Sequence, residues 1–178
     1  MKKYICLFFL FSISIPVFCQ DVMINGINNN RLLTWEDFTG KPDNHSLHDA
    51  NTKWNLSYSY QGYTLNGDYV KIKGLKMILE LDQRSSWIKP GKETVPLLKH
   101  EQGHFDIGLI CLQEMTARLN NASYYKNEFP GKLKTDFNSI LNKYILLNSK
   151  YDEETNHSQD KTKQQKWDDY FSRELKAR

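Results

Sequence analysis

The chain has 178 residues, of which 39% are hydrophobic, 25% are charged and 13% are aromatic, and its formal net charge is +3. This length and composition predict one globular domain with its own core, and they exclude a collagen, a coiled-coil rod, a disordered tail and a multi-pass membrane protein. The small net charge implies no basic face, so nucleic-acid binding is not expected.

The N-terminus has the pattern of a secretory signal peptide. Lys2 and Lys3 form a short positive start, and the apolar run at 4–18 follows. This run is as long as a secretory hydrophobic region and too short for a comfortable transmembrane span, although an anchor is the alternative. Cleavage is expected between Cys19 and Gln20, because the bulky Phe18 disfavours lipidation of Cys19.

We therefore expect a signal peptide at 1–19 and a single domain at 20–178. The protein is expected to be exported, either periplasmic or extracellular, and to lack a membrane span in its mature form. Cys111 is then the one cysteine of the mature domain, and its apolar neighbours predict a buried structural thiol.

Strands are expected in the first half of the domain. A docking turn or short helix is predicted at 32–38, with Thr34 as its cap. Apolar and polar residues then alternate at 53–63, which is typical of a half-buried strand. Asn66-Gly67-Asp68 is a tight-turn signal. Further strands are predicted at 69–72, 75–81 and 85–88.

The second half is expected to be helical. Apolar residues recur at three- and four-residue spacing from 97 to 115, which predicts one long helix with Pro96 in its first turn. A second amphipathic stripe covers 137–151, and a last helix is predicted at 167–175. Strands followed by helices indicate an α+β fold rather than a parallel α/β sheet.

The sequence His100-Glu101-Gln102-Gly103-His104 fits the HExxH pattern. On a helix the two histidines lie one turn apart on one face, so that both imidazoles can bind one zinc ion. Glu101 lies close enough to take a proton from a water at the open zinc position. Asp106 is turned away from this face, and we expect it to form a salt bridge or a bond to a neighbouring loop instead.

A catalytic zinc site needs a third protein ligand. His157 is the first candidate, because residues three apart share a helix face and Tyr151, Glu154 and His157 have that spacing. Glu154 is a rival ligand or a hydrogen-bond acceptor, and Tyr151 is a candidate donor to a developing oxyanion. Glu128 is a further rival.

The other two histidines, His45 and His48, lie in a polar loop and are expected to be ordinary surface residues.

The run LLKHEQGHFDI at 97–107 resembles the signature of small secreted bacterial proteins catalogued as domain of unknown function 922, whose members are taken to be zinc-dependent proteases. The likeness extends to WEDFTGKP at 35–42, to RSSWI at 84–88, and to the segment 151–158 with Trp167. It therefore covers nearly all of the expected domain.

The resemblance implies a compact zinc-peptidase-like domain with His100 and His104 as ligands and Glu101 as the base. It also implies that a later segment completes the site, which here matches Tyr151, Asp152, Thr155 and His157. One departure is Ser158, where the family pattern has glycine.

Taken together, we expect an exported, zincin-like α+β domain with HExxH on a central helix. Zn²⁺ is expected at His100, His104 and His157, with Glu101 as general base and Tyr151 as oxyanion donor. The expected substrate is a peptide or protein, which pairs with a strand near 77–81. The alternative is a non-catalytic, zinc-containing binding or structural module of the cell envelope.

Overall fold

The computed structural model describes residues 19–29 and 31–175. The predicted signal segment lies outside these residues except for Cys19, which begins the first strand. The strands are β1 (Cys19–Ile24), β2 (Ile27–Asn28), β3 (Ala50–Asn51), β4 (Trp54–Ser59), β5 (Gly62–Asn66), β6 (Tyr69–Lys73), β7 (Lys76–Leu81), β8 (Trp87–Ile88) and β9 (Tyr124–Tyr125). The helices are η1 (Trp35–Asp37), α1 (Val95–Asn121), α2 (Gly131–Thr155) and α3 (Lys161–Glu174). The predicted α+β order, with strands first and helices second, is confirmed.

The main sheet has the strand order β2-β1-β7-β4. β7 lies in its interior, because it pairs in parallel with β1 and antiparallel with β4. The expectation that 77–81 runs along the cleft and pairs with a peptide is therefore wrong, since both edges of β7 are already occupied. β4 is the edge strand of this sheet. β1 was not among the predicted strands.

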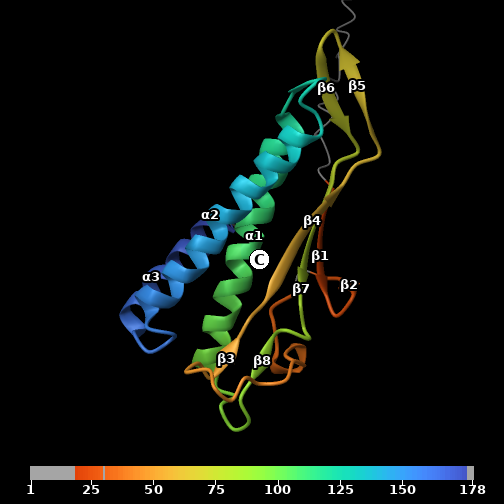
Figure 1. The fold of residues 1–178 in the computed structure, drawn as a ribbon. Helices are drawn as coiled ribbons and strands as arrows, with labels where there is room; N and C mark the ends of the chain where they lie inside the picture. The colour runs from red at the N-terminus through yellow and green to blue at the C-terminus, as the bar shows by residue number, and fades with distance from the viewer. Residues whose placement is uncertain (1–18, 30, 176–178) are drawn as a thin grey trace, which may run out of the picture.

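A second sheet, β5-β6-β9, continues from the main sheet and projects beyond it (Figure 1). The turn predicted at Asn66-Gly67-Asp68 is confirmed, and Gly67 has the positive φ of 60° that such a turn requires. The strand predicted at 53–63 is divided in two near Tyr60, because β4 pairs with β7 whereas β5 pairs with β6. The pairing partner changes from β7 to β6 at that point.

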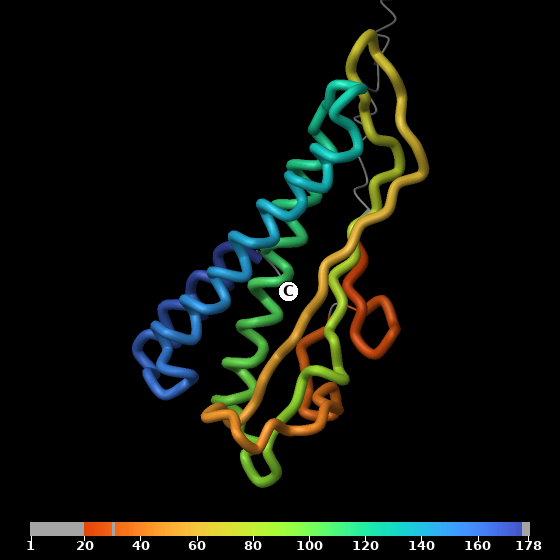
Figure 2. The backbone as a smooth tube through the Cα atoms, in the orientation of Figure 1, coloured from red at the N-terminus to blue at the C-terminus, as the bar shows by residue number. Residues whose placement is uncertain are grey.

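The long helix α1 carries the predicted motif near its N-terminus. Thr94 caps it by accepting a hydrogen bond from the Leu97 amide at 3.3 Å, and Pro96 lies in its first turn as predicted. α2 runs back antiparallel to α1, and α3 lies beside both helices (Figures 1 and 2). The C-terminal end of α2 is thereby brought to the motif.

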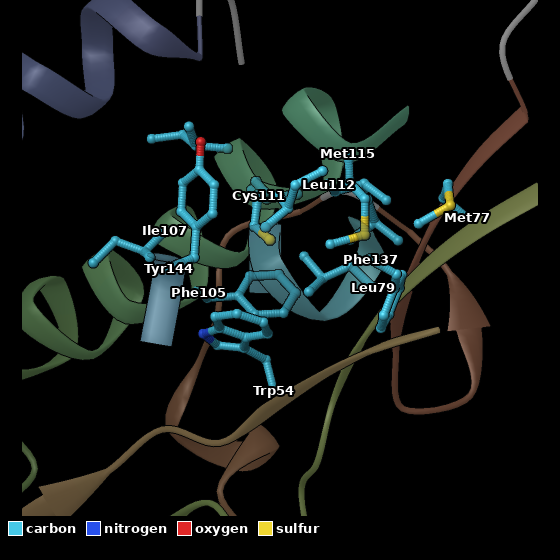
Figure 3. Close-up of a cluster of buried hydrophobic side chains, with 14 of the residues drawn as sticks. Trp54, Met77, Leu79, Phe105, Ile107, Cys111, Leu112, Met115, Phe137 and Tyr144 are labelled. Atoms are coloured by element: carbon cyan, nitrogen blue, oxygen red, sulfur yellow. The ribbon is translucent and has the colours of Figure 1, made fainter. Parts of the chain in front are cut away.

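The core lies between α1 and its neighbours on both sides. α1 contacts β4 and β7 on one side and α2 and α3 on the other. Figure 3 shows part of this buried cluster, which comes from β4, β7, α1 and α2. Cys111 is fully buried there, and burial raises the pKa of its thiol to about 12, in agreement with the predicted structural role.

The segment before β3 is attached to α1 beside the motif. The Leu33 amide donates to Oε1 of Gln102 at 2.7 Å, and Nε2 of Gln102 donates to Asp106 at 2.8 Å. Arg31 and the Thr34 amide both donate to the buried carboxylate of Asp37. The short helix predicted with Thr34 as its cap is confirmed, and Asp106 faces Gln102 rather than the two histidines.

Of the helices in the described part of the chain, none combines the length and the apolar character needed to cross a bilayer.

Candidate metal centre

His100 and His104 direct the same ring nitrogen toward one point. Nε2 of His100 lies 3.1 Å from Oδ1 of Asp152, and Nε2 of His104 lies 3.0 Å from the same oxygen. The two rings leave α1 one turn apart, which is the geometry expected from a four-residue spacing. Both residues are buried, with 2% and 8% of their surface exposed.

Asp152 on α2 is the third member of this cluster, and the sequence analysis gave it no ligand role. One ligand atom from each of His100, His104 and Asp152 lies within 4.8 Å of the other two, and residues 19–29 and 31–175 contain no second group of this kind. The sequence contains a pattern that indicates this role, because Asn148 and Asp152 are four residues apart and share a face of α2. That spacing could have drawn attention to Asp152.

The second nitrogen of His100 is held by α3. Nδ1 lies 3.1 Å from Oε1 of Gln164, which is buried. The amide of Gln164 cannot be reversed, because its Nε2 donates to a carboxylate oxygen of Asp168 at 2.9 Å. An amide oxygen only accepts, so Nδ1 of His100 carries the proton.

The second nitrogen of His104 is held by α2 in the same way. Nδ1 lies 2.8 Å from Oδ1 of Asn148. Nδ2 of Asn148 donates to the Tyr144 carbonyl at 3.2 Å, which fixes the orientation of this amide as well. His104 therefore also carries its proton on Nδ1.

With both Nδ1 atoms donating, neutral imidazoles leave a bare lone pair on each Nε2. These lone pairs and Oδ1 of Asp152 face one another, an arrangement that requires a proton or a cation among them. Burial alone would lower the pKa of His104 and raise that of Asp152. Contact between them outweighs burial, so the pKa of His104 is raised and the pKa of Asp152 is held well below its usual value.

The donor set fits a cation of the size of zinc. Ligands 2.0 to 2.2 Å from a tetrahedral zinc ion are about 3.3–3.5 Å apart. The two nitrogen–oxygen separations are 3.0 and 3.1 Å, which is within a few tenths of an ångström of that value. Two imidazoles and a carboxylate are also a ligand set of catalytic zinc sites, whereas calcium and magnesium prefer oxygen ligands.

Glu101 lies beside this cluster at the wall of a cleft. Its surface is only 3% exposed, and its Oε2 accepts a hydrogen bond from the Thr52 hydroxyl at 2.6 Å. The contact fixes one carboxylate oxygen and leaves Oε1 for another proton. The geometry places this carboxylate and the two histidines along the same cleft.

His157 lies at the mouth of the cleft rather than within the cluster. α2 ends at Thr155, and Asn156, His157 and Ser158 all have positive φ, at 46°, 50° and 75°. The helical stripe therefore stops before His157, and the prediction that it shares a face with Tyr151 is wrong.

The His157 side chain is 43% exposed and its Nδ1 lies 3.4 Å from Oδ1 of Asp152. Its ring is 4.0 Å from that of His48, which was expected to be an ordinary surface residue and which reaches the cleft from the opposite wall. Ser158 stands where the family pattern has glycine. Its left-handed φ explains that preference, because glycine adopts this conformation without strain.

Tyr151 supports the site from behind. Its side chain is fully buried, and its hydroxyl donates to the His100 carbonyl at 3.1 Å and accepts from Nε2 of Gln164 at 2.8 Å. The ring stacks on that of His100 with centroids 4.6 Å apart. The predicted role as oxyanion donor conflicts with this geometry, because the hydroxyl does not reach the cleft. Tyr151 instead positions His100.

The two rival ligands lie elsewhere. Oε2 of Glu154 accepts from the Trp167 indole at 2.9 Å, so this carboxylate joins α2 to α3. Glu128 follows the C-terminal end of α1, and the part of the helix between His100 and Asn121 is about 30 Å long. Neither carboxylate is part of the cluster.

The cleft has a volume of about 480 Å³. Residues 47–56, which include the start of β4, form one wall, and the part of α2 from Leu141 to Asp152 forms the other. The motif of α1 lies between these walls, and residues 157–159 close one end. β4 pairs with β7 alone among the described strands, so its other edge has no strand partner.

The family model for bacterial proteins of unknown function (DUF922) matches residues 30–158, which is more than half of the chain. None of the curated proteins and none of the solved structures gives a significant match. The matched region includes α1 and α2 with the histidine–aspartate cluster, and it ends before α3. By this match the chain belongs to the family of bacterial proteins of unknown function DUF922.

Proposed function

We propose that this protein is a zinc-dependent metallopeptidase with a zincin-like site. The observation that carries the proposal is the convergence of two imidazole lone pairs and one carboxylate oxygen at the wall of a cleft, with both imidazoles fixed as acceptors by the side-chain amides of Gln164 and Asn148. His100, His104 and Asp152 would hold the ion. We prefer Asp152 to His157 as third ligand, because its oxygen is about 3 Å from both nitrogens.

A zinc ion bound there supplies Lewis acidity, which lowers the pKa of a bound water toward about 7 and polarises a carbonyl group. Glu101 acts as the general base and accepts the proton of the attacking water on its carboxylate. The hydrogen bond from Thr52 to Oε2 orients the carboxylate, so that Oε1 is the atom that takes the proton. Glu101 then delivers this proton to the nitrogen of the leaving amine.

The shape of the cleft favours a peptide as the substrate. The unpaired edge of β4 begins at the site, and an extended peptide can add to such an edge through main-chain hydrogen bonds. β4 thus takes the role that the sequence analysis assigned to 77–81. We further propose that residues 1–19 direct export and are removed, which the intact mass of the protein recovered from cells would test.

The test compares the wild type with Glu101→Gln and His100→Ala. Zinc is measured in protein purified without chelators, and cleavage is measured on a peptide library. We expect Glu101→Gln to keep its zinc and to lose cleavage by about 10²- to 10⁴-fold. His100→Ala should lose both.

Three results would argue against the proposal. Cleavage that survives Glu101→Gln would remove the assigned base. A wild type that holds zinc but cleaves no peptide would favour the non-catalytic binding module. A wild type without zinc, even after incubation with it, would leave a structural protein.

A further inference from the structure

The two ends of the cleft differ in character. Toward one end lie the polar residues His48, His157 and Ser158, together with the exposed Leu47 next to His48 in the chain. Toward the other end, beyond His104 and Asn148, aliphatic side chains line both walls. These are Leu56 of β4 and Leu141 and Ile145 of α2.

This aliphatic end is only partly covered by the core, against which Leu56 and Leu141 pack. Ile145 is 49% exposed, although it lies on the wall of the cleft. Leu56 and Leu141 are half-buried beside it. When an apolar group covers water-exposed aliphatic surface in a concave site, the free energy of the complex falls.

We propose that Leu56, Leu141 and Ile145 form a subsite for a large apolar side chain of the peptide substrate. The inference rests on the proposed peptidase function and adds the substrate class to it. Ile145 precedes Asp152 by seven residues on α2, which is about 10 Å along the helix. An extended peptide covers this distance in about three residues. The subsite therefore selects a leucine, isoleucine, methionine or phenylalanine two or three residues from the scissile bond.

α2 provides a matched control in the next residue. Leu146 is 70% exposed and does not line the cleft. The substitutions Ile145→Asp and Leu146→Asp place the same charge on adjacent exposed positions of one helix. Their effects on helix formation should be similar, so a difference between them reports on the cleft.

The first experiment profiles cleavage of a synthetic peptide library by the wild type and both variants. The wild type should prefer a large apolar residue at one position, two or three residues from the cleaved bond. Ile145→Asp should reduce kcat/KM for peptides with leucine at that position by about tenfold to a hundredfold relative to peptides with serine there. Leu146→Asp should leave this ratio unchanged. Cleavage without an apolar preference, or an equal loss in both variants, would overturn the subsite and leave the peptidase proposal intact.

The second experiment does not depend on catalysis. Methyl NMR spectra of the Glu101→Gln variant are recorded with a leucine tetrapeptide and with a serine tetrapeptide. The leucine peptide should shift the methyl signals of Leu56, Leu141 and Ile145, and the serine peptide should not. Equal shifts with both peptides, or none with the leucine peptide, would refute the subsite even if no bond is cleaved.

Discussion

Replacement of Gly103 by alanine tests how closely α1 and α2 must approach at the site. A Cβ atom built on Gly103 lies 2.3 Å from the Tyr151 hydroxyl oxygen, 2.7 Å from Cζ of the same ring and 2.9 Å from Phe171. Tyr151 is fully buried and cannot move aside into solvent. The second x of this HExxH motif must therefore be a glycine if Tyr151 is to stack on His100.

The expected cost follows from three contributions. Overpacking of a dense core costs about 1–3 kcal/mol. Displacement of the Tyr151 hydroxyl also removes its hydrogen bond to the His100 carbonyl, which contributes about 0.5–1.5 kcal/mol. The better helix propensity of alanine returns about 0.5–1 kcal/mol. Gly103→Ala should therefore lower the free energy of unfolding by about 0.5–4 kcal/mol, and the midpoint of about 2 kcal/mol corresponds to a decrease in Tm of about 4–8 °C for a chain of this size.

Two other helical glycines serve as controls. A Cβ on Gly108 meets Leu79 and Trp54 at 3.0 Å, and a Cβ on Gly131 meets nothing within 4 Å. Gly108→Ala should therefore cost less than Gly103→Ala, and Gly131→Ala should be neutral or stabilising by up to about 1 kcal/mol. Urea denaturation and calorimetry would measure all three. If Gly103→Ala were as stable as Gly131→Ala, the close contact between α1 and Tyr151 would be wrong.

Three further predictions concern single side chains. Gln164→Leu should weaken zinc binding about 10- to 100-fold in competition with a chromophoric chelator, because it removes the acceptor that fixes the His100 imidazole. Gln165→Leu, on the exposed side of α3, should leave the zinc affinity unchanged. Equal zinc affinities of the two variants would contradict the tautomer assigned to His100. Asp152→Ala should lose more zinc on gel filtration than His157→Ala, and the reverse order would make His157 the third ligand. Burial alone would raise the pKa of Asp37, but its hydrogen bonds with Arg31 and Thr34 hold that pKa below the usual value. The charge of Asp37 therefore stabilises the fold above about pH 4, and this contribution is lost on further acidification. Asp37→Asn should cost about 1–3 kcal/mol at pH 7 and flatten the acid limb of the unfolding free energy below about pH 4, and an unchanged acid limb would refute this role.

Features that depend on neighbouring residues could be predicted from the sequence. The β5–β6 turn follows from Asn66-Gly67, and the start of α1 follows from Thr94 and Pro96. The spacing of His100 and His104 places two rings on one face whatever the rest of the chain does. These predictions need only the geometry of a turn or of a single helix.

Features that depend on contacts between distant segments could not be predicted in the same way. The assignment of Asp152 requires the docking of α2 against α1, which brings together residues 48 and 52 positions apart in the chain. The prediction for His157 assumed that α2 continues past Thr155, but three left-handed residues end it there. β1 was missed because its parallel pairing with β7 joins residues 57 positions apart in the chain.

The position of Gln164 has a consequence for the order of events during synthesis. α3 follows α1 and α2 in the described part of the chain, and Gln164 on it accepts from the proton-bearing nitrogen of His100, a residue that is synthesised much earlier. A chain that still lacks α3 has both histidines and Asp152, and Asn148 still fixes the ring of His104, but no residue then selects the His100 ring form that exposes Nε2. The His100 ring form is therefore fixed only once α3 has packed against α1, and a chain truncated before Lys161 should hold less zinc than the full chain in the same metal analysis.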